Sequence, residues 1–387
     1  MDRNRLKIET ILAHLSEYGD VKDPYGASHM PIYQTATFDL KKQGDDPYDY
    51  TRSGNPTRES LENVLSKVCG GLGTSLTHTG LGAVALLFES TLKAGDEILI
   101  DKDTYGGTFR LIKSYQDRLN ITPHFIDFLD YASVEGKLKN NNIKLILLES
   151  PTNPGLKIMD IERISKLSKK YNTIFAIDNS LATFASQRPL ELGADISIFS
   201  TTKYISGHGS VIGGAVVTNR ADLLEVIKFT ANAQGRSQNP MDVHTISLGI
   251  PSLPIRLKAH QEKALEIAKW LEKNKKVTRV VYPGLESHPQ YELAKKQMTY
   301  FNGVMTVDFI SVEVAEEVVT KTLLFSEKCS FGTADSRIEI PGKISHASFS
   351  EEELSEIGIK PSTVRISVGL EDASDLINDL KGILGEQ

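Results

Sequence analysis

Lys203 is the residue whose type and position point most directly to chemistry. It stands in the stretch SIFSTTKYISGHGSVIGG, where an apolar run ends and a glycine-rich turn begins. A lysine at such a place can pair with a carboxylate, extend its amine to water, or act as an amine nucleophile toward a carbonyl. Its position alone leaves all three roles open, and the neighbouring groups have to decide between them.

Two further groups stand beside short apolar runs. Asp178, in IDNS, ends an apolar strand, where a carboxylate is costly unless it meets a cation or a protonated nitrogen. A buried ion pair or a helix cap would explain this acid equally well. The glycine-rich TGLGA, residues 79–83, precedes an apolar helix. Its free N–H groups suit a phosphate, although tight packing is the commoner reason for such glycines.

Hydroxyl and aromatic side chains complete the set. Ser200 and Thr202 lie close to Lys203 in the sequence, and Tyr105 of DTYGGTFR follows another apolar run, where its ring can stack on a flat ligand. A lysine for a Schiff base, an acid for a protonated ring nitrogen, an aromatic ring, and hydroxyl and N–H groups for a phosphate together describe a holder for pyridoxal phosphate.

The elements expected to position these groups are short apolar strands that alternate with amphipathic helices. The strand candidates are residues 97–100, 124–128, 144–150, 173–178, 196–200 and 211–218, and residues 161–171 have a helical pattern. This alternation predicts an α/β domain with a mostly parallel sheet covered on both faces. Ligands of such sheets bind beyond the carboxyl ends of the strands, so Asp178 and Lys203 are expected to meet there.

The sequence predicts three parts. Residues 1–55 are rich in proline, glycine and tyrosine and are expected to form an arm that folds against another surface. Residues 56–253 form the large α/β domain, and residues 254–387 form a smaller α+β domain. In that last part we expect a helix from about residue 257 to 276, strands at 303–310 and 363–370, and a helix that opens at Ser350, with Glu353 completing a capping box.

Composition narrows the possible functions. The 387 residues carry a net charge of −6, with 40% hydrophobic and 24% charged residues, as in an ordinary globular protein. No basic block suggests nucleic acid, and no apolar run suggests a membrane span or a signal peptide. The two cysteines form neither a disulfide framework nor a metal-type spacing. We therefore expect a cytoplasmic protein without a metal site.

The chain closely resembles a known family. The motifs that carry the resemblance are, in order, YDYTRSGNPTRESLE, DTYGGTFR, ESPTNP, AIDNS, STTKYISGHG, YPGLESHP, SHAS and VRISVGLED. They are similar to those of the Cys/Met-metabolism (trans-sulfuration) family of pyridoxal-phosphate enzymes, which includes cystathionine γ-lyases, cystathionine γ-synthases and methionine γ-lyases. The resemblance covers residues 31–380 and implies the fold-type I transferase architecture.

The resemblance also implies residue roles. Lys203 and Tyr105 would be catalytic, and Tyr50 and Arg52 of the arm would reach the phosphate held by a neighbouring subunit. The cofactor-binding residues that it implies are Tyr50, Arg52, Gly80, Leu81, Tyr105, Asp178, Ser200, Thr202 and Lys203. The substrate-binding residues that it implies are Asp49, Arg110, Asn153, Asp335, Ser336 and Arg365. The assembly that it implies is a homotetramer, a dimer of dimers.

Three stretches depart from the family pattern. GHGSV at 207–211 replaces the usual GHSDV, Leu248 replaces an arginine before Gly249, and SFGTADSR at 330–337 replaces SLGG-x-ESL. Gly107 stands where methionine γ-lyases carry a reactive cysteine, which argues against that activity. The departures remove no cofactor contact but leave the substrate open.

The resemblance thus implies a carbon–sulfur enzyme of sulfur amino-acid metabolism, and we expect an elimination of the cystathionine γ-lyase type. Asp49 and Asp335 would then pair with the second ammonium of cystathionine. The alternatives are γ-replacement on an O-acyl-homoserine by cysteine, a methionine γ-lyase, and a catalytically weakened subunit that binds the cofactor.

Overall fold

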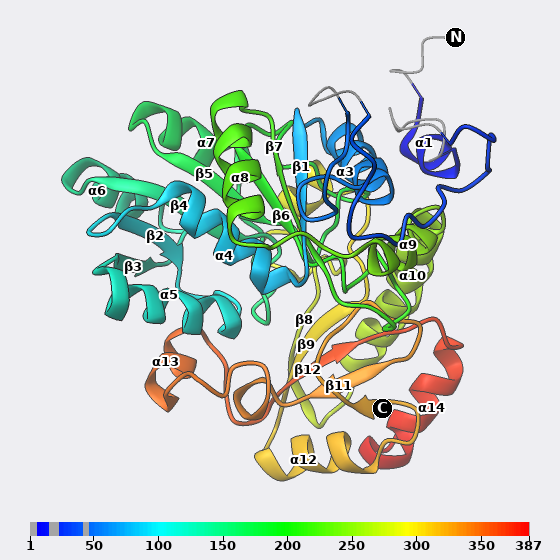
Figure 1. Cartoon of the computed structure of the whole chain (residues 1–387). Helices are drawn as coiled ribbons and strands as arrows, with labels where there is room; N and C mark the ends of the chain where they lie inside the picture. The colour runs from blue at the N-terminus through cyan, green and yellow to red at the C-terminus, as the bar shows by residue number, and fades with distance from the viewer. Residues whose placement is uncertain (1–5, 15–22, 42–45, 387) are drawn as a thin grey trace.

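Two β-sheets with packed helices form the body of the protein (Figure 1). The structure is a computed structural model, and it describes residues 6–14, 23–41 and 46–386. The strand order of the larger sheet is β1-β7-β6-β5-β4-β2-β3. Its strands are β1 (Gly73–Thr77), β2 (Glu97–Asp101), β3 (Thr122–Ile126), β4 (Ile143–Glu149), β5 (Ile174–Asp178), β6 (Ile196–Phe199) and β7 (Gly214–Thr218). Strand β7 pairs antiparallel with β1 and β6, whereas the other neighbouring strands pair parallel. The expected mostly parallel α/β sheet is confirmed.

Helices cover both faces of this sheet. They are α4 (Gly80–Thr91), α5 (Gly106–Leu119) and α8 (Ala221–Ala233) on one face, and α6 (Tyr131–Asn140) and α7 (Ile161–Lys170) on the other. Strand β2 shows why two covered faces are needed, because Ile98 and Ile100 pack into one apolar cluster and Leu99 into the other. A strand buried on both sides is continuously apolar, as the sequence pattern indicates.

The carboxyl ends of the central strands meet at one edge of the sheet. Glu149 ends β4 and is the register partner of Asp178, which ends β5. Strand β6 ends at Phe199, four residues before Lys203. The parallel pairing of β4, β5 and β6 therefore brings the three polar groups together, as expected from the strand ends.

The smaller sheet has the order β10-β11-β12-β9-β8. Its strands are β8 (Val277–Val281), β9 (Val304–Phe309), β10 (Ser326–Glu327), β11 (Arg337–Glu339) and β12 (Thr363–Ser367). The elements around it are α10 (Leu253–Leu271), α11 (Tyr291–Gln297), α12 (Val312–Lys321), η2 (Pro341–Lys343), α13 (Glu351–Glu356) and α14 (Ala373–Leu384). Ser350 and Glu353 form the expected capping box of α13.

Several expected elements begin elsewhere, and β3, for example, spans Thr122–Ile126 rather than 124–128. Helix α10 spans Leu253–Leu271 rather than 257–276, because Pro254 stands in its first turn, where proline needs no N–H partner. Strand β7 begins at Gly214 rather than at residue 211. The residue before it, Gly213, bonds through its backbone to the hydroxyl of Thr202 and so belongs to the turn beside Lys203.

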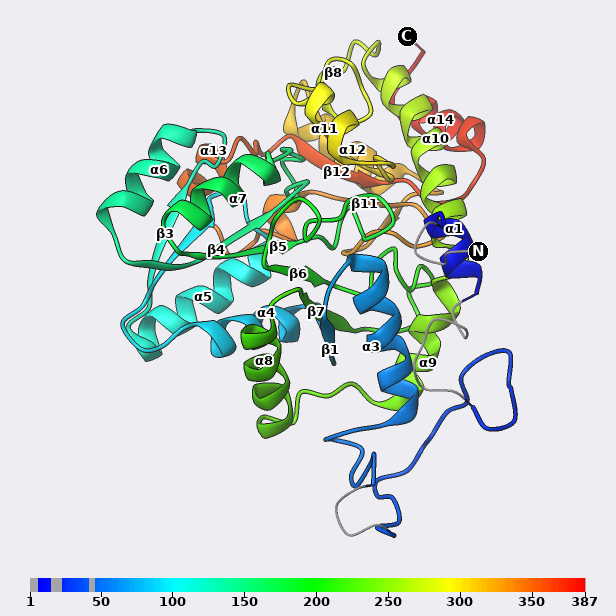
Figure 2. The same cartoon turned by 90° about the horizontal axis from the view of Figure 1, so that it is seen from above.

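The arm lies outside both sheets. Figure 2 shows the segment before α3 (Pro56–Cys69) running along α3 and α9 (Pro240–Gly249) and projecting away from the body. Within it, α1 (Ile8–Ala13) buries Leu12, and Thr37 forms a bridge with Tyr50. Helix α3 begins at Pro56, and residues 1–5, 15–22 and 42–45 of the arm lie outside the described ranges. No helix in the described ranges is long and apolar enough to cross a membrane.

Candidate active site

A cavity of about 480 Å³ lies at the carboxyl ends of β4, β5 and β6 and is closed on its other side by residues of the smaller domain. Lys203, Asp178, Gly80, Tyr105 and Arg365 all line it. Residues that are as much as 285 positions apart in the sequence thus face one space. Other residues that line it are Thr79, Leu81, Arg110, Glu149, Asn153, Ser180, Ser200, Thr202, Cys329, Ser330 and Phe331.

Lys203 is held by a contact across the cavity. Its Nζ donates a hydrogen bond to Oγ of Ser330 at 2.7 Å and lies 4.8 Å from the centre of the Phe331 ring. Burial, and after it the positive charge of Arg365, lowers the pKa of Lys203 from its usual 10.5 to about 8. About a tenth of the amine is therefore neutral and nucleophilic at pH 7, far more than for an exposed lysine.

Two carboxyl groups lie side by side at the strand ends. Oδ1 of Asp178 accepts a hydrogen bond from the amide of Ser180 at 2.9 Å, and Oε1 of Glu149 accepts one from the amide of Tyr105 at 2.7 Å. Burial raises the pKa of Asp178, and burial together with the nearby Asp178 raises that of Glu149 well above its usual value. A cationic or protonated partner in the cavity would offset the cost of burying two negative charges next to each other.

A cradle for an anion lies at the start of α4. Gly80 and Leu81 occupy the first helical positions, whose N–H groups have no acceptor within the helix. A Cβ on Gly80 would lie 2.6 Å from Cβ of Ser200, so glycine is required where the two segments meet. Ser200 and Thr202, which both carry hydroxyls, line the same cavity. This combination of helix N–H groups and hydroxyls suits a phosphate.

A buried arginine enters from the smaller domain. Arg365 is 3% exposed, and it donates through Nη1 to Oδ1 of Asn153 and through Nη2 to the carbonyl of Ser330, each at 3.0 Å. Nη2 also lies 3.1 Å from Oε1 of Glu339, its register partner on β11. Its Nε is buried and has no hydrogen-bond partner among the described residues.

The chain is similar to known proteins over nearly its whole length. The family model for Cys/Met metabolism PLP-dependent enzymes matches residues 9–384. A cystathionine beta-lyase of Lactococcus lactis is 38% identical over 93% of this chain and 94% of its own length. An L-methionine gamma-lyase of Fusobacterium nucleatum is 39% identical over 94% of this chain and 95% of its own. The crystal structure of cystathionine gamma-lyase from Lactobacillus plantarum complexed with L-serine has a TM-score of 0.94 at 34% identity, covering 99% of this chain and 100% of that one.

The chain belongs to the Cys/Met-metabolism family of PLP-dependent enzymes. Its fold is that of the family, and its cofactor is pyridoxal phosphate. The residues present fit that group: Gly80 lets Ser200 approach the start of α4, Lys203 offers a partly neutral amine, and a protonated ring nitrogen would stabilise the charged form of the desolvated Asp178 carboxyl. In the described part of the chain, no group of three or more potential metal ligands is arranged around one point.

Tyr105 lines the cavity at the start of α5. It is the N-cap residue of α5 and is 38% exposed at the cavity. A Cβ on Gly107 would lie 2.4 Å from Cε1 of Tyr105, so Gly107 leaves room for the ring to fold over the first turn. Burial raises the pKa of the Tyr105 phenol, with the charge of Arg110 opposing it, so the phenol holds its proton near neutral pH.

Two predicted substrate residues of the smaller domain, Ser336 and Asp335, are absent from the described lining of this cavity. Ser336 is fully buried and bonds through Oγ to Glu371 and to the amide of Gly369, at 2.9 and 2.8 Å. Asp335 faces Arg337 and Lys328, at 3.3 and 3.6 Å. The hydroxyl of Ser336 and the carboxylate of Asp335, which the resemblance assigns to the substrate, thus contact other residues of the chain.

The arm residues also lie apart from the cavity of their own chain. Asp49 accepts a hydrogen bond from the amide of Tyr50 at 2.6 Å. The Arg52 guanidinium lies 5.3 Å from the centre of the Tyr50 ring, which is 43% exposed. Asp49, Tyr50 and Arg52 are absent from the described lining of the cavity. Their roles therefore stay predictions that require a second copy of the chain.

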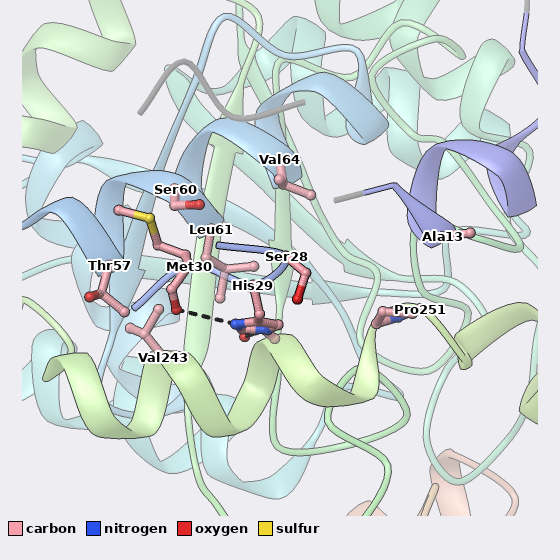
Figure 3. Close-up of a pocket in the computed structure, with 11 residues that line it drawn as sticks. Ala13, Ser28, His29, Met30, Thr57, Ser60, Leu61, Val64, Val243 and Pro251 are labelled. Carbon is pink, nitrogen blue, oxygen red and sulfur yellow. Dashed lines mark hydrogen bonds between the residues drawn. The ribbon is translucent and has the colours of Figure 1, made fainter. Parts of the chain in front are cut away.

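A second, smaller cavity of about 100 Å³ lies where the arm meets α3 and α9 (Figure 3). His29 points into it, bonds to the carbonyl of Met30 at 3.2 Å, and pairs with Oγ of Ser247 at 3.0 Å. The lining residues around it are apolar or carry hydroxyls, with neither lysine nor carboxylate among them. This cavity marks the packing of the arm and offers no group for the cofactor.

Sequence reasoning missed part of the smaller domain's contribution. Ser330 and Phe331, which contact Lys203, were read only as part of a departure from the family pattern. Ser180 was also missed; its Oγ accepts from the amide of Ser200 at 2.6 Å. The sequence signal for Ser180 was its position two residues beyond Asp178, whereas nothing in the local sequence of Ser330 indicates its distant partners.

Proposed function

We propose that this enzyme cleaves a carbon–sulfur bond of cystathionine by elimination of the γ-lyase type. The observation that carries the proposal is a cavity lined by two arginines, the buried Arg365 and the exposed Arg110, next to the partly neutral Lys203. Cystathionine has two carboxylates and methionine has one. Arg365 would bind the α-carboxylate, and Arg110, which lies 3.3 Å from Oγ of Ser348, would bind the distal one.

Different residues of the chain would bind the cofactor and transfer the protons of the reaction. Pyridoxal phosphate, when bound, supplies an electron sink for the bonds at Cα. Gly80, Leu81, Ser200 and Thr202 would hold its phosphate. Lys203 Nζ would accept the proton from Cα of the amino acid and, for elimination at Cγ, the proton from Cβ. Its pKa of about 8 suits this exchange near neutral pH.

Tyr105 and Asn153 would assist at the two sides of the reacting amino acid. The Tyr105 phenol, which keeps its proton because burial raises its pKa, would donate that proton to the departing sulfur. Oδ1 of Asn153 accepts from Nη1 of Arg365 and so would orient the arginine that binds the carboxylate. This assignment requires the phenol only as an acid in the elimination step.

The experiment is a product assay with cystathionine, methionine, homocysteine, cysteine and an O-acyl-homoserine plus cysteine offered side by side. Cleavage at Cγ consumes water and releases cysteine, ammonia and a four-carbon 2-oxo acid, whereas cleavage at Cβ also consumes water and releases homocysteine, ammonia and a three-carbon 2-oxo acid. Faster turnover of methionine than of cystathionine would contradict the proposal. Net formation of cystathionine as the fastest reaction would favour γ-replacement instead.

We also propose that the arm completes the cavity of a second copy, within a homotetramer that works in the cytoplasm. Arg58 is buried and donates to the carbonyls of Thr51 and Arg52 at 2.7 and 3.1 Å, which fixes the arm backbone on α3. The side chains of Tyr50 and Arg52 remain outside the chain's own cavity. A two-fold dimer would let each arm serve the other subunit.

A mixing experiment tests the shared site. Lys203→Ala and Arg52→Ala lose activity separately, but a hybrid dimer has one cavity with both defects and one with neither. Random mixing should therefore restore about a quarter of the wild-type activity. Mixtures that stay as inactive as their components, or a fully active monomer in sedimentation, would refute the arrangement.

A further inference from the structure

Ser330 forms hydrogen bonds with both Lys203 and Arg365. Its Oγ accepts from Nζ of Lys203 at 2.7 Å, and its carbonyl accepts from Nη2 of Arg365 at 3.0 Å. Ser330 does this with a φ of 81°, in the left-handed region that side-chain-bearing residues rarely occupy. Such a conformation persists only where the surroundings hold it in place. The residues on both sides of Ser330 therefore help to set the positions of the Lys203 and Arg365 side chains.

The segment that follows Ser330 is held through the backbone of Gly332. The amide of Gly332 donates to Oγ of Ser367 at 3.3 Å, and a Cβ on Gly332 would lie 2.7 Å from the amide nitrogen of Tyr204. The segment after Ser330 is thus packed directly against the residue that follows Lys203.

The other side is held by one side chain. Nη1 of Arg337 donates to the carbonyl of Cys329 at 3.0 Å, so it fixes the peptide that leads into Ser330. Arg337 is the first residue of β11, and its backbone pairs with Ser367 on β12. Its side chain is 15% exposed. A guanidinium on a sheet strand is a rigid support for a loop carbonyl.

Arg337 is itself placed by two neighbours. Asp335 accepts from its Nη2 and Nε at 3.3 and 3.4 Å. Gly209, with a φ of 63°, leaves the space next to it, since a Cβ there would lie 3.2 Å from Nη2 of Arg337 and 3.1 Å from Cγ2 of Thr333. The stretches GHGSV and SFGTADSR, far apart in the sequence, therefore meet at this guanidinium.

We propose that Arg337 is a positioning residue for the carbon–sulfur reaction. It holds the carbonyl of Cys329, thereby keeps Ser330 in its left-handed conformation, and through Ser330 orients Nζ of Lys203 and the guanidinium of Arg365. Asp335 and Gly209 keep Arg337 in place for this task. The inference rests on the proposed function, because it takes Arg365 as the ligand of the substrate α-carboxylate.

Cys329 provides a test that needs no turnover. Its thiol is exposed, whereas Cys69 is buried and serves as an unreactive reference. In cofactor-free protein, Arg337→Leu frees the Cys329 carbonyl, and alkylation of Cys329 by iodoacetamide should become at least about threefold faster as the loop opens more often. The matched control is Arg220→Leu, which removes an exposed arginine paired with Asp222 at 2.6 Å and should leave the rate unchanged.

Kinetics of the holoenzyme give the second readout. Arg337→Leu should raise KM for cystathionine at least about fivefold while the absorbance of the bound cofactor persists, because Arg365 loses its support. Gly209→Ser should produce a weaker form of both effects by displacing Arg337. In the Arg337→Leu background the same serine should add less, since contacting residues do not act additively.

The outcomes separate the possibilities. Wild-type alkylation and wild-type KM in Arg337→Leu would overturn the inference, and so would a raised KM without faster alkylation. If Arg337→Leu fails to fold by thermal unfolding, Gly209→Ser decides by the same two measurements. A wild-type enzyme that turns over no sulfur amino acid would overturn the proposed function, and alkylation alone would then decide whether Arg337 holds the loop.

Discussion

The two sides of the active site are built in different ways. The side from the large domain consists of Asp178, Lys203 and Gly80, which stand where parallel strands end or a helix begins. The side from the smaller domain consists of Arg365 on a strand and Ser330 on a loop, held by side chains from several segments. The first follows from topology, whereas the second depends on individual contacts. Substitutions should therefore separate cofactor binding from substrate binding.

The largest effect is expected on the side of the large domain. Lys203→Ala should lower turnover at least about 1,000-fold and abolish the absorbance of the covalently held cofactor, because Lys203 is the only lysine in the described lining of the cavity. Turnover and the absorbance spectrum check this in one preparation. Circular dichroism should show an unchanged fold, and retention of much of the wild-type rate would disprove the role of this lysine.

On the side of the smaller domain, Arg365→Lys tests the substrate contact without leaving Glu339 opposite an uncharged group. The lysine keeps the charge but loses the planar fork, which costs about 1.5–3 kcal/mol per charged hydrogen bond. We expect kcat/KM for cystathionine to fall about 10- to 150-fold, mostly through KM. Cofactor absorbance should stay at the wild-type level. A fall in cofactor binding with an unchanged KM would reverse the assignment of the two sides.

The amine on the large-domain side should also show its environment in a pH profile. Because the neutral form reacts and the pKa of Lys203 is lowered to about 8, the rate of covalent cofactor capture should rise about tenfold per pH unit below 8 and level off above it. Stopped-flow absorbance with cofactor-free protein measures this rate. A free lysine side chain, with a pKa of about 10.4, provides the control that should still rise at pH 9. A profile like that control would contradict the buried site.

The smallest effect is expected at Asp335. Its side chain is 44% exposed and pairs with Arg337 and Lys328, and exposed pairs contribute about 0.2–1 kcal/mol. Asp335→Asn should lower kcat/KM up to about fivefold, by the same factor for cystathionine and methionine, because it acts through the loop. Parallel assays of both substrates check this. A loss confined to cystathionine would instead show that Asp335 binds the distal ammonium.

These contrasts also show what the sequence could predict. Asp178 and Lys203 follow apolar strands, so their meeting follows from the parallel order of β4, β5 and β6. Gly80 was recognisable because glycine before an apolar helix indicates close approach. Ser336 could not be placed, because its hydroxyl is taken by Glu371, 35 residues away. Ser330 could not be predicted either, because its conformation is set by Arg337 and Gly332 and not by its own propensity.

The paired carboxyl groups of Asp178 and Glu149 have a consequence for the newly made chain. Their raised pKa values mean that the folded cofactor-free protein binds more protons than the unfolded chain above about pH 4. Its stability therefore falls as the pH rises from there toward the folded pKa values. A bound ring with a positive nitrogen removes this penalty. We therefore expect a chain that has not yet bound pyridoxal phosphate to lose stability through these two carboxyl groups as the pH rises, and binding of the cofactor to the folded chain to restore it.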